Sequence, residues 1–170
     1  MAKQQAKPLQ PPHSLSLQAA EGWMELGNAA EAKSEVLKIP VRFRSHPDVL
    51  EVHWHICARL GQWEVCLDLA RTLTRKAPGR VSGWVNLSFA LHELKMTIEA
   101  WDNLFAVAAR FPSEPTIPYN LACYGAELGR LWEAERWLKQ AFKLGKAEEL
   151  KRLALADSDL KPLWDRIEQL

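Results

Sequence analysis

Residues 81–114 read VSGWVNLSFALHELKMTIEAWDNLFAVAARFPSE, and this stretch decides the fold. Its first half carries an apolar stripe at the three- and four-residue spacing of an amphipathic helix, formed by Trp84, Leu87, Leu91 and Leu94. A second stripe begins at Ala100, and Pro112 ends it, because proline cannot continue the helical hydrogen-bond ladder. The stretch therefore predicts two helices joined by a tight turn.

The same pattern recurs without gaps in blocks that begin at residues 13, 47, 81 and 115, a period of 34 residues. The fourteenth place of each block carries leucine, the fifteenth carries glycine or lysine, and the twentieth carries a small residue. In block order these are Leu26, Leu60, Leu94 and Leu128; Gly27, Gly61, Lys95 and Gly129; and Ala32, Cys66, Ala100 and Ala134. Such a period indicates stacked repeats, each burying its apolar face against its neighbours.

This pattern resembles the tetratricopeptide repeat (TPR) family, in particular small bacterial members. The family places tryptophan, leucine and a small residue at the fourth, seventh and eighth places, which Trp84, Leu87 and Ser88 match. The resemblance implies an all-α fold, a right-handed superhelix (an α-α solenoid) of about four helix pairs followed by C-terminal capping helices. We accordingly divide the chain into a flexible N-terminal arm, four repeats and a cap: residues 1–12, 13–46, 47–80, 81–114, 115–148 and 149–170.

Two local features modify this plan. Pro40 lies inside the second helix of the first repeat, so we expect that helix to be kinked or shortened. In the cap, Leu160, Leu163, Trp164 and Ile167 form a further apolar stripe, which should pack against the last repeat because the end of a solenoid needs a different outer face.

Composition argues against several functional classes. The 22 Lys and Arg residues balance 21 Asp and Glu residues, and a net charge of +1 gives no global attraction to nucleic acid or membranes. No secretory signal or long apolar run is present, so we expect a soluble, cytoplasmic protein. Phosphate loops, dinucleotide fingerprints and zinc motifs are absent, which predicts a non-enzymatic protein without cofactor or metal.

The positions of the histidines and cysteines give little support for a metal site, a disulfide or a reactive thiol. Glu51 and His55 share a helix face that His92 could approach, but we favour a solvated polar groove over a metal site. Cys57 and Cys66 occupy inward places and read as small buried hydrophobes, although a disulfide between them is conceivable. Cys123 should point toward the groove, so it is the thiol most open to reaction, although we expect it to be inert.

The resemblance implies that the first helices of successive pairs line a concave groove. We expect this groove to bind a protein or peptide partner that is basic or amphipathic, since six acids stand there against Arg59 alone. The acids are Glu21, Glu25, Asp48, Glu51, Glu93 and Glu127, and the interleaved residues are His55, Asn86, Phe89, His92, Tyr119 and Asn120.

One ligand class of the family fits poorly. Members that hold chaperone C-termini clamp the terminal carboxylates with cationic side chains, and Asn86 and Asn120 match the asparagine place of that clamp. The basic places carry Leu17 or Glu51 and Ser82 or Thr116 instead. Carboxylate recognition needs cationic donors, so we expect no binding of chaperone tails.

An alternative interface lies on the opposite side of the repeats. Ile98, Phe105 and Trp132 occupy equivalent outward places, and an exposed aromatic and aliphatic patch marks many interfaces. The alternatives to groove binding are therefore a homodimeric scaffold that self-assembles through this patch, or a TPR chaperone of the kind found in type III secretion. The alternative without a functional role is that the C-terminal segment covers the patch.

Overall fold

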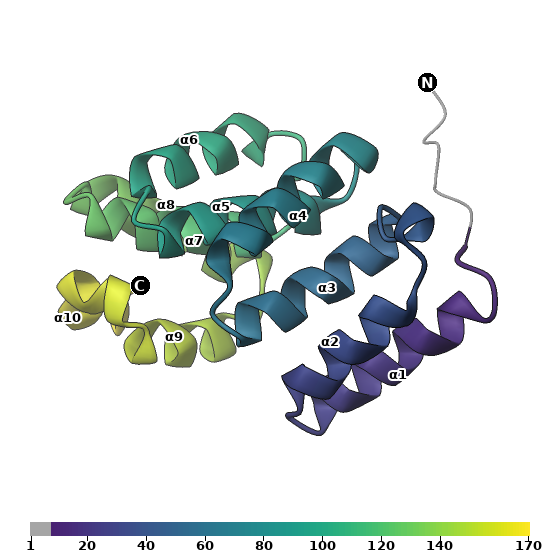
Figure 1. The fold of residues 1–170 in the computed structure, drawn as a ribbon. Coiled ribbons are helices and arrows are strands. Elements are labelled where there is room, and N and C mark those ends of the chain that lie inside the picture. Colours follow the sequence, from purple (N-terminus) through teal and green to yellow (C-terminus); the bar gives the residue numbers. More distant parts are fainter. Residues whose placement is uncertain (1–7) are drawn as a thin grey trace. The chain divides into compact units, whose positions relative to one another are not determined.

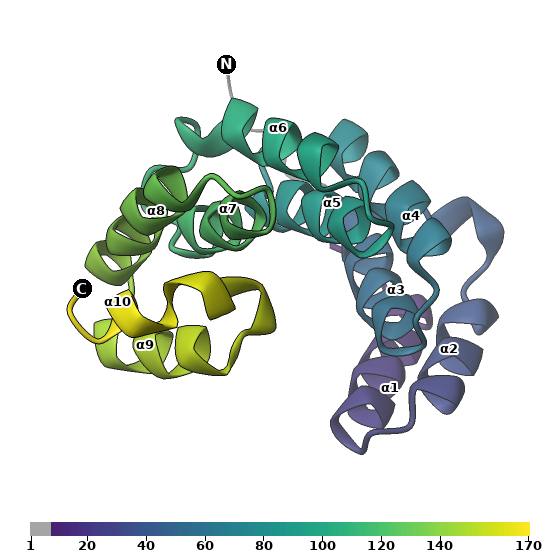
Figure 2. The same ribbon diagram turned by 90° about the vertical axis from the view of Figure 1, so that its left-hand side faces the viewer.

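The computed structural model describes residues 8–170, and all regular structure in this range is helical (Figures 1 and 2). The helices are α1 (His13–Glu25), α2 (Ala29–Lys38), η1 (Val41–Phe43), α3 (Pro47–Arg59), α4 (Trp63–Lys76), α5 (Val81–Glu93), α6 (Thr97–Ala108), α7 (Thr116–Glu127), α8 (Leu131–Leu144), α9 (Ala147–Ala156), η2 (Ser158–Leu163) and α10 (Trp164–Ile167), where η marks a 3-10 helix. Consecutive helices run antiparallel as pairs, as Figure 1 shows for α1 with α2 and for α3 with α4. The predicted all-α architecture of helix pairs is confirmed.

These helices belong to two compact units, Met1–Ala90 and Leu91–Leu170, and the division falls inside α5. In the first unit α1 packs against α2, α2 against α3, and α3 against α4. In the second unit α7 packs against both α6 and α8, while η2 lies against α7 and α9 against α8 (Figure 2).

The turn inside each pair uses one backbone device. Gly27, Gly61, Lys95 and Gly129 all have a positive φ, between 64° and 77°. In each turn the next residue donates its N–H to the carbonyl five residues back, as Asn28 does to Trp23 at 2.8 Å and Met96 to Leu91 at 2.9 Å. This left-handed closure satisfies carbonyl groups that the end of a helix leaves unpaired. The glycine predicted at the fifteenth place therefore has its expected role, and Lys95 adopts the same conformation with a side chain attached.

Small residues allow the paired helices to approach closely. The residue at the twentieth place is fully buried in every pair, with zero relative exposure for Ala32, Cys66, Ala100 and Ala134. Between α7 and α8 the approach is especially tight, since a Cβ added at Gly125 would lie 3.2 Å from the Cβ of Ala134. Such spacing leaves no room for a larger side chain at either position.

Pro40 shortens α2, as the sequence predicts. The helix ends at Lys38, and Ile39 already has an extended backbone with φ −68° and ψ 125°. The Arg44 side chain then donates hydrogen bonds to the carbonyl oxygens of Ile39 at 2.8 Å and Leu37 at 2.7 Å. These bonds replace part of the backbone pairing that the end of the helix lacks.

The two ends of the chain pack as follows. The arm is expected over residues 1–12, of which residues 1–7 lie outside the described part of the chain. Within residues 8–12, Leu9 is partly buried against the apolar cluster of α1, α2 and α3. At the other end Leu160, Leu163 and Ile167 are fully buried, which confirms that the C-terminal stripe is packed. The Trp164 indole adds hydrogen bonds to the carbonyl oxygens of Ala154 and Asp157, at 3.1 and 3.2 Å.

Lys95 provides a test of the turn. A left-handed residue with a Cβ is strained by roughly 1–2 kcal/mol, part of which glycine gives back through the greater freedom of the unfolded chain. Lys95→Gly should therefore raise the free energy of unfolding by about 0.5–1 kcal/mol, measured by urea denaturation. Lys95→Ala keeps the Cβ and is the matched control, for which no gain is expected. Equal stability of the two variants would contradict this account.

Candidate functional site

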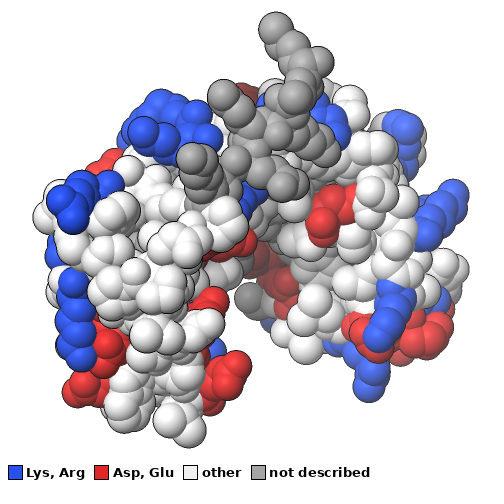
Figure 3. Space-filling model, turned by 90° about the vertical axis from the view of Figure 1, so that its right-hand side faces the viewer, with Lys and Arg blue, Asp and Glu red and all other residues white. Residues whose placement is uncertain are grey.

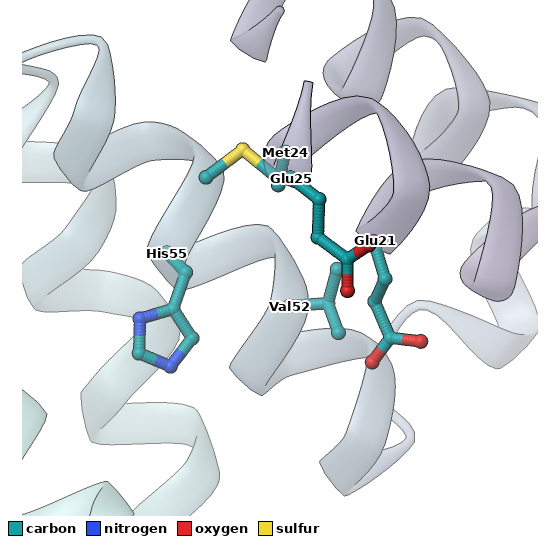
Figure 4. A pocket seen from close by; sticks show the side chains of 5 residues that line it. All are labelled: Glu21, Met24, Glu25, Val52 and His55. Carbon is teal, nitrogen blue, oxygen red and sulfur yellow. The ribbon is translucent and has the colours of Figure 1, made fainter. Parts of the chain in front are cut away.

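The face formed by α1 and α3 carries an open hollow of about 450 Å³. Glu21, Met24 and Glu25 line it from α1, where their spacing of three and four places them on one side of the helix, and Val52 and His55 line it from α3 (Figure 4). Met24 and Val52 also pack against the apolar cluster beneath. We call this surface the α1/α3 face; it combines an apolar floor with carboxylates at its edge.

The charges of this face are exposed. Glu21, Glu25 and His55 lie open to solvent, as does Arg59 one turn further along α3. Within residues 8–170 neither Glu21 nor Glu25 has a cationic side chain in ion-pair distance. Two unpaired carboxylates four residues apart on one helix repel each other, so a cation placed between them is favourable.

Other acids on the predicted groove list are already neutralised. Arg80, in the loop before α5, contacts Asp48 at 2.6 Å and Glu51 at 3.2 Å. Arg80 is the last residue of the second block and lies outside the first helices of the pairs, so the predicted groove list does not include it. The acidic excess is therefore smaller than predicted and concentrates on Glu21 and Glu25.

Asn86 and Phe89, also on the groove list, are not freely exposed. Asn86 is only 6% exposed, and its amide nitrogen has no hydrogen-bond partner among the described residues. Phe89 is half-buried, with its ring 6.2 Å from that of Trp54 and 5.8 Å from that of Trp63, centroid to centroid. Phe89 therefore belongs largely to the packing of the first unit.

In the second unit two of the predicted groove residues, His92 and Tyr119, are covered by the chain itself. The Tyr119 hydroxyl donates a hydrogen bond to Asp157 at 3.1 Å, and the two ring nitrogens of His92 lie 3.0 Å from Glu127 and 3.0 Å from Asp159. Tyr119 and His92 are each only 7% exposed. The prediction that these two residues line an open groove is wrong, because the segment from Asp157 onward lies over them.

Glu127 forms the far side of this network. The Thr97 hydroxyl donates to the same Glu127 oxygen at 3.1 Å and lies 3.3 Å from His92. Each ring nitrogen of His92 therefore faces one carboxylate, Glu127 at the end of α7 and Asp159 in η2. Glu93 and Asn120, the remaining members of the groove list, are half-buried.

The cysteines differ from the expectation in one respect. All three are free and buried. Burial raises the pKa of Cys66 to about 12, and it also raises the pKa of Cys123, with the Asp157 and Asp159 carboxylates adding to the effect. The Cys123 thiol donates to Asp157 at 3.5 Å. Cys123 is thus sequestered, and the prediction that it points into an open groove is wrong.

The patch of Ile98, Phe105 and Trp132 is exposed on α6 and α8, with relative exposures of 56%, 56% and 67%. The guanidinium of Arg136 lies 4.7 Å from the Trp132 ring centroid, and the Phe105 ring lies 6.2 Å from that of Trp101. Coverage by the C-terminal segment, the alternative considered from the sequence, does not occur for these three residues.

Other classes of site find no support in residues 8–170. These residues contain no group of three or more His, Cys, Asp or Glu residues placed to hold a metal ion, and none of their helices has the length and apolar character needed to cross a membrane. On the face drawn in Figure 3, acidic and basic side chains stand among large uncharged areas. A continuous basic surface, as needed for a nucleic-acid backbone, is not visible on that face.

The fold recurs in solved structures. A thermophilic TPR protein of Thermus thermophilus, TTC0263, superposes with a TM-score of 0.72 at 19% identity, over 93% of this chain and 100% of that chain. The chain has the tetratricopeptide-repeat fold. MamA from Desulfovibrio magneticus RS-1 is similar as well, with a TM-score of 0.71 at 16% identity over 96% of this chain and 97% of its own. No protein-family model matches the sequence, and no curated protein shows significant similarity to it.

Cys123 reports on the covering of α7 by the C-terminal segment. Because its pKa is raised, the thiolate fraction near pH 8 is small and alkylation should be slow. Asp157→Ala removes a neighbouring negative charge and a contact of the segment, so it should speed iodoacetamide labelling of Cys123 at least tenfold, followed by peptide mapping. Asp165→Ala, in the same segment and exposed, is the control. An equal effect of both substitutions would show that the segment does not shield the thiol.

Proposed function

We propose that the chain is a non-enzymatic protein-interaction module that binds a basic or amphipathic peptide or helix on the α1/α3 face. The observation that carries the proposal is the pair of exposed, unpaired carboxylates of Glu21 and Glu25 beside an apolar floor. A helix or strand with lysines or arginines on one side and apolar residues on the other complements that surface. The TPR fold supports an interaction role, since its repeats present the surfaces of successive first helices.

Each part of such a partner would contribute differently. Met24 and Val52 give the apolar contact that holds a bound segment, because removing apolar area from water is the main source of affinity. Glu21 and Glu25 attract cations and fix the orientation of the segment, which acts mostly on the rate of association and on specificity. His55 stands at the edge of the hollow and adds a polar contact.

The organisation of the chain fits this role. We propose that residues 13–46, 47–80, 81–114 and 115–148 are the four repeats and that residues 149–170 form the cap. The open binding surface then belongs to the first two repeats alone, which is narrower than a groove through all four.

A charge-reversal experiment tests the α1/α3 face. The probe is a labelled amphipathic helical peptide with lysines on one side and leucines on the other, and binding is measured by fluorescence anisotropy. Glu21→Lys with Glu25→Lys should weaken binding at least tenfold. Binding to the unmodified chain should also fall with added salt, because the Debye length is about 8 Å at physiological ionic strength.

Glu31→Lys with Glu64→Lys is the matched control, since it makes the same change in net charge at exposed positions of α2 and α4. The control should bind nearly as tightly as the unmodified chain. If both double variants lose affinity equally, binding reflects net charge only, and the α1/α3 face is not the site.

The second candidate function is self-assembly through the Ile98, Phe105 and Trp132 patch. Its support is the exposure of three large apolar side chains on neighbouring helices. In a two-fold contact each copy would use the same patch, and a specific interface should bury more than about 1,000 Å². The charged side chains of Glu99, Asp102, Glu133 and Arg136 would then form the rim.

Sedimentation separates the two functions. If the patch mediates self-assembly, the unmodified chain should sediment as a dimer, and Phe105→Glu with Trp132→Glu should give a folded monomer because charges in an apolar interface are costly to desolvate. Leu153→Glu, at a residue 53% exposed on α9, is the control and should leave the dimer intact. A monomer at high micromolar concentration of the unmodified chain would rule out this function.

A further inference from the structure

A second face of the molecule already holds a ligand-like segment of its own chain. The face consists of His92 at the end of α5 together with Tyr119 and Cys123 on α7, and we call it the α5/α7 face. All three side chains are buried. The segment that covers them is residues 157–163, which consist of Asp157, the residue after α9, and the 3-10 helix η2.

The contacts of this segment are directional. Asp157 accepts hydrogen bonds from the Tyr119 hydroxyl at 3.1 Å and from the Cys123 thiol at 3.5 Å, and Asp159 lies 3.0 Å from a His92 ring nitrogen. Asp157 also accepts the backbone N–H of Asp159 at 3.1 Å, which fixes the spacing of the two carboxylates. A plain apolar cap needs none of these bonds.

Apolar anchors follow the two acids. Leu160 and Leu163 have zero relative exposure, and η2 lies against α7 and α8. The segment thus combines two carboxylates two residues apart with two buried leucines that follow them in the sequence. Charged groups that set the orientation and buried apolar groups that supply the affinity are the usual components of a short recognition motif.

We infer that the α5/α7 face is a binding site for an acidic segment of the pattern Asp-x-Asp-Leu, and that residues 157–160 are its internal occupant. A partner protein carrying this pattern competes with the internal segment for Tyr119, Cys123 and His92. The inference adds a second site to the proposed interaction function, and it uses different residues and the opposite ligand charge from the α1/α3 face. Failure at either face therefore leaves the other untouched.

The tether makes the internal segment a strong competitor. A short connection gives an attached ligand an effective concentration on the order of millimolar. The apparent affinity for an external segment is the intrinsic affinity multiplied by the fraction of molecules in which the site is open. Weakening the internal segment should consequently strengthen binding of an external one, which a segment with a purely structural role would not do.

The test uses a labelled peptide with the sequence of residues 154–170, ALADSDLKPLWDRIEQL, and fluorescence anisotropy on the full chain. The protein with Asp157→Ala and Asp159→Ala, which we call the opened variant, should bind this peptide at least tenfold more tightly than the unmodified chain does. Asp165→Ala with Glu168→Ala, outside the pattern and exposed, is the matched control and should bind like the unmodified chain. Adding Tyr119→Phe and His92→Gln to the opened variant should remove the gain.

The pattern itself is tested with a second peptide that carries Asp157→Asn and Asp159→Asn. It should bind the opened variant at least tenfold more weakly than the first peptide. Equal binding of the two peptides, or no gain in the opened variant, would overturn the inference. A dimer of the unmodified chain that dissociates in the opened variant would also overturn it, because the segment would then come from a second copy.

Amide hydrogen exchange provides a second test that does not need the opened variant, in case that variant is unfolded by circular dichroism. In the unmodified chain, millimolar peptide should displace the internal segment and speed exchange of the amides of residues 157–163 several-fold. The asparagine peptide should have no such effect. Unchanged exchange with the first peptide would show that the segment is a permanent part of the fold.

Discussion

The close approach of paired helices at one small residue is the contact on which the rest of the structure depends. Ala32, Cys66, Ala100 and Ala134 are completely buried, and a larger side chain there would force the helices apart. The left-handed turn fifteen places into each block sets up this approach, because it reverses the chain within a few residues. The apolar stripes can then interlock, and the outer surfaces of the helices become available for binding.

Local rules explain how much of the fold could be predicted. Helix starts and ends, the left-handed turns and the shortened α2 follow from residues that act on their own neighbours, as Pro40 and Gly129 do. The four helix pairs follow from the period, since blocks with the same pattern of apolar, small and turn residues fold in the same way. The positive φ of Lys95 was predictable only by its place in the repeat, because lysine on its own does not favour that conformation.

The candidate site was harder to predict because its charges are set by residues distant in sequence. Arg80 neutralises Asp48 and Glu51 from a loop, and Asp159 reaches His92 from 67 residues away. The contacts of Asp157 to Tyr119 and Cys123 on α7 do not follow from the pattern of its own segment, because they depend on how the chain returns. As a result the predicted groove divides into an open acidic surface on α1 and α3 and a covered one on α5 and α7.

The covering of α7 also has a consequence for biosynthesis. The ribosome makes Tyr119, Cys123 and the rest of α7 before it makes residues 157–163, and domains begin to fold while the chain is still growing at about 5–20 residues per second. The nascent chain therefore passes through a stage in which α7 exists without Leu160 and Leu163 against it. The apolar side of α7 that η2 covers in the folded chain stays accessible until the segment emerges.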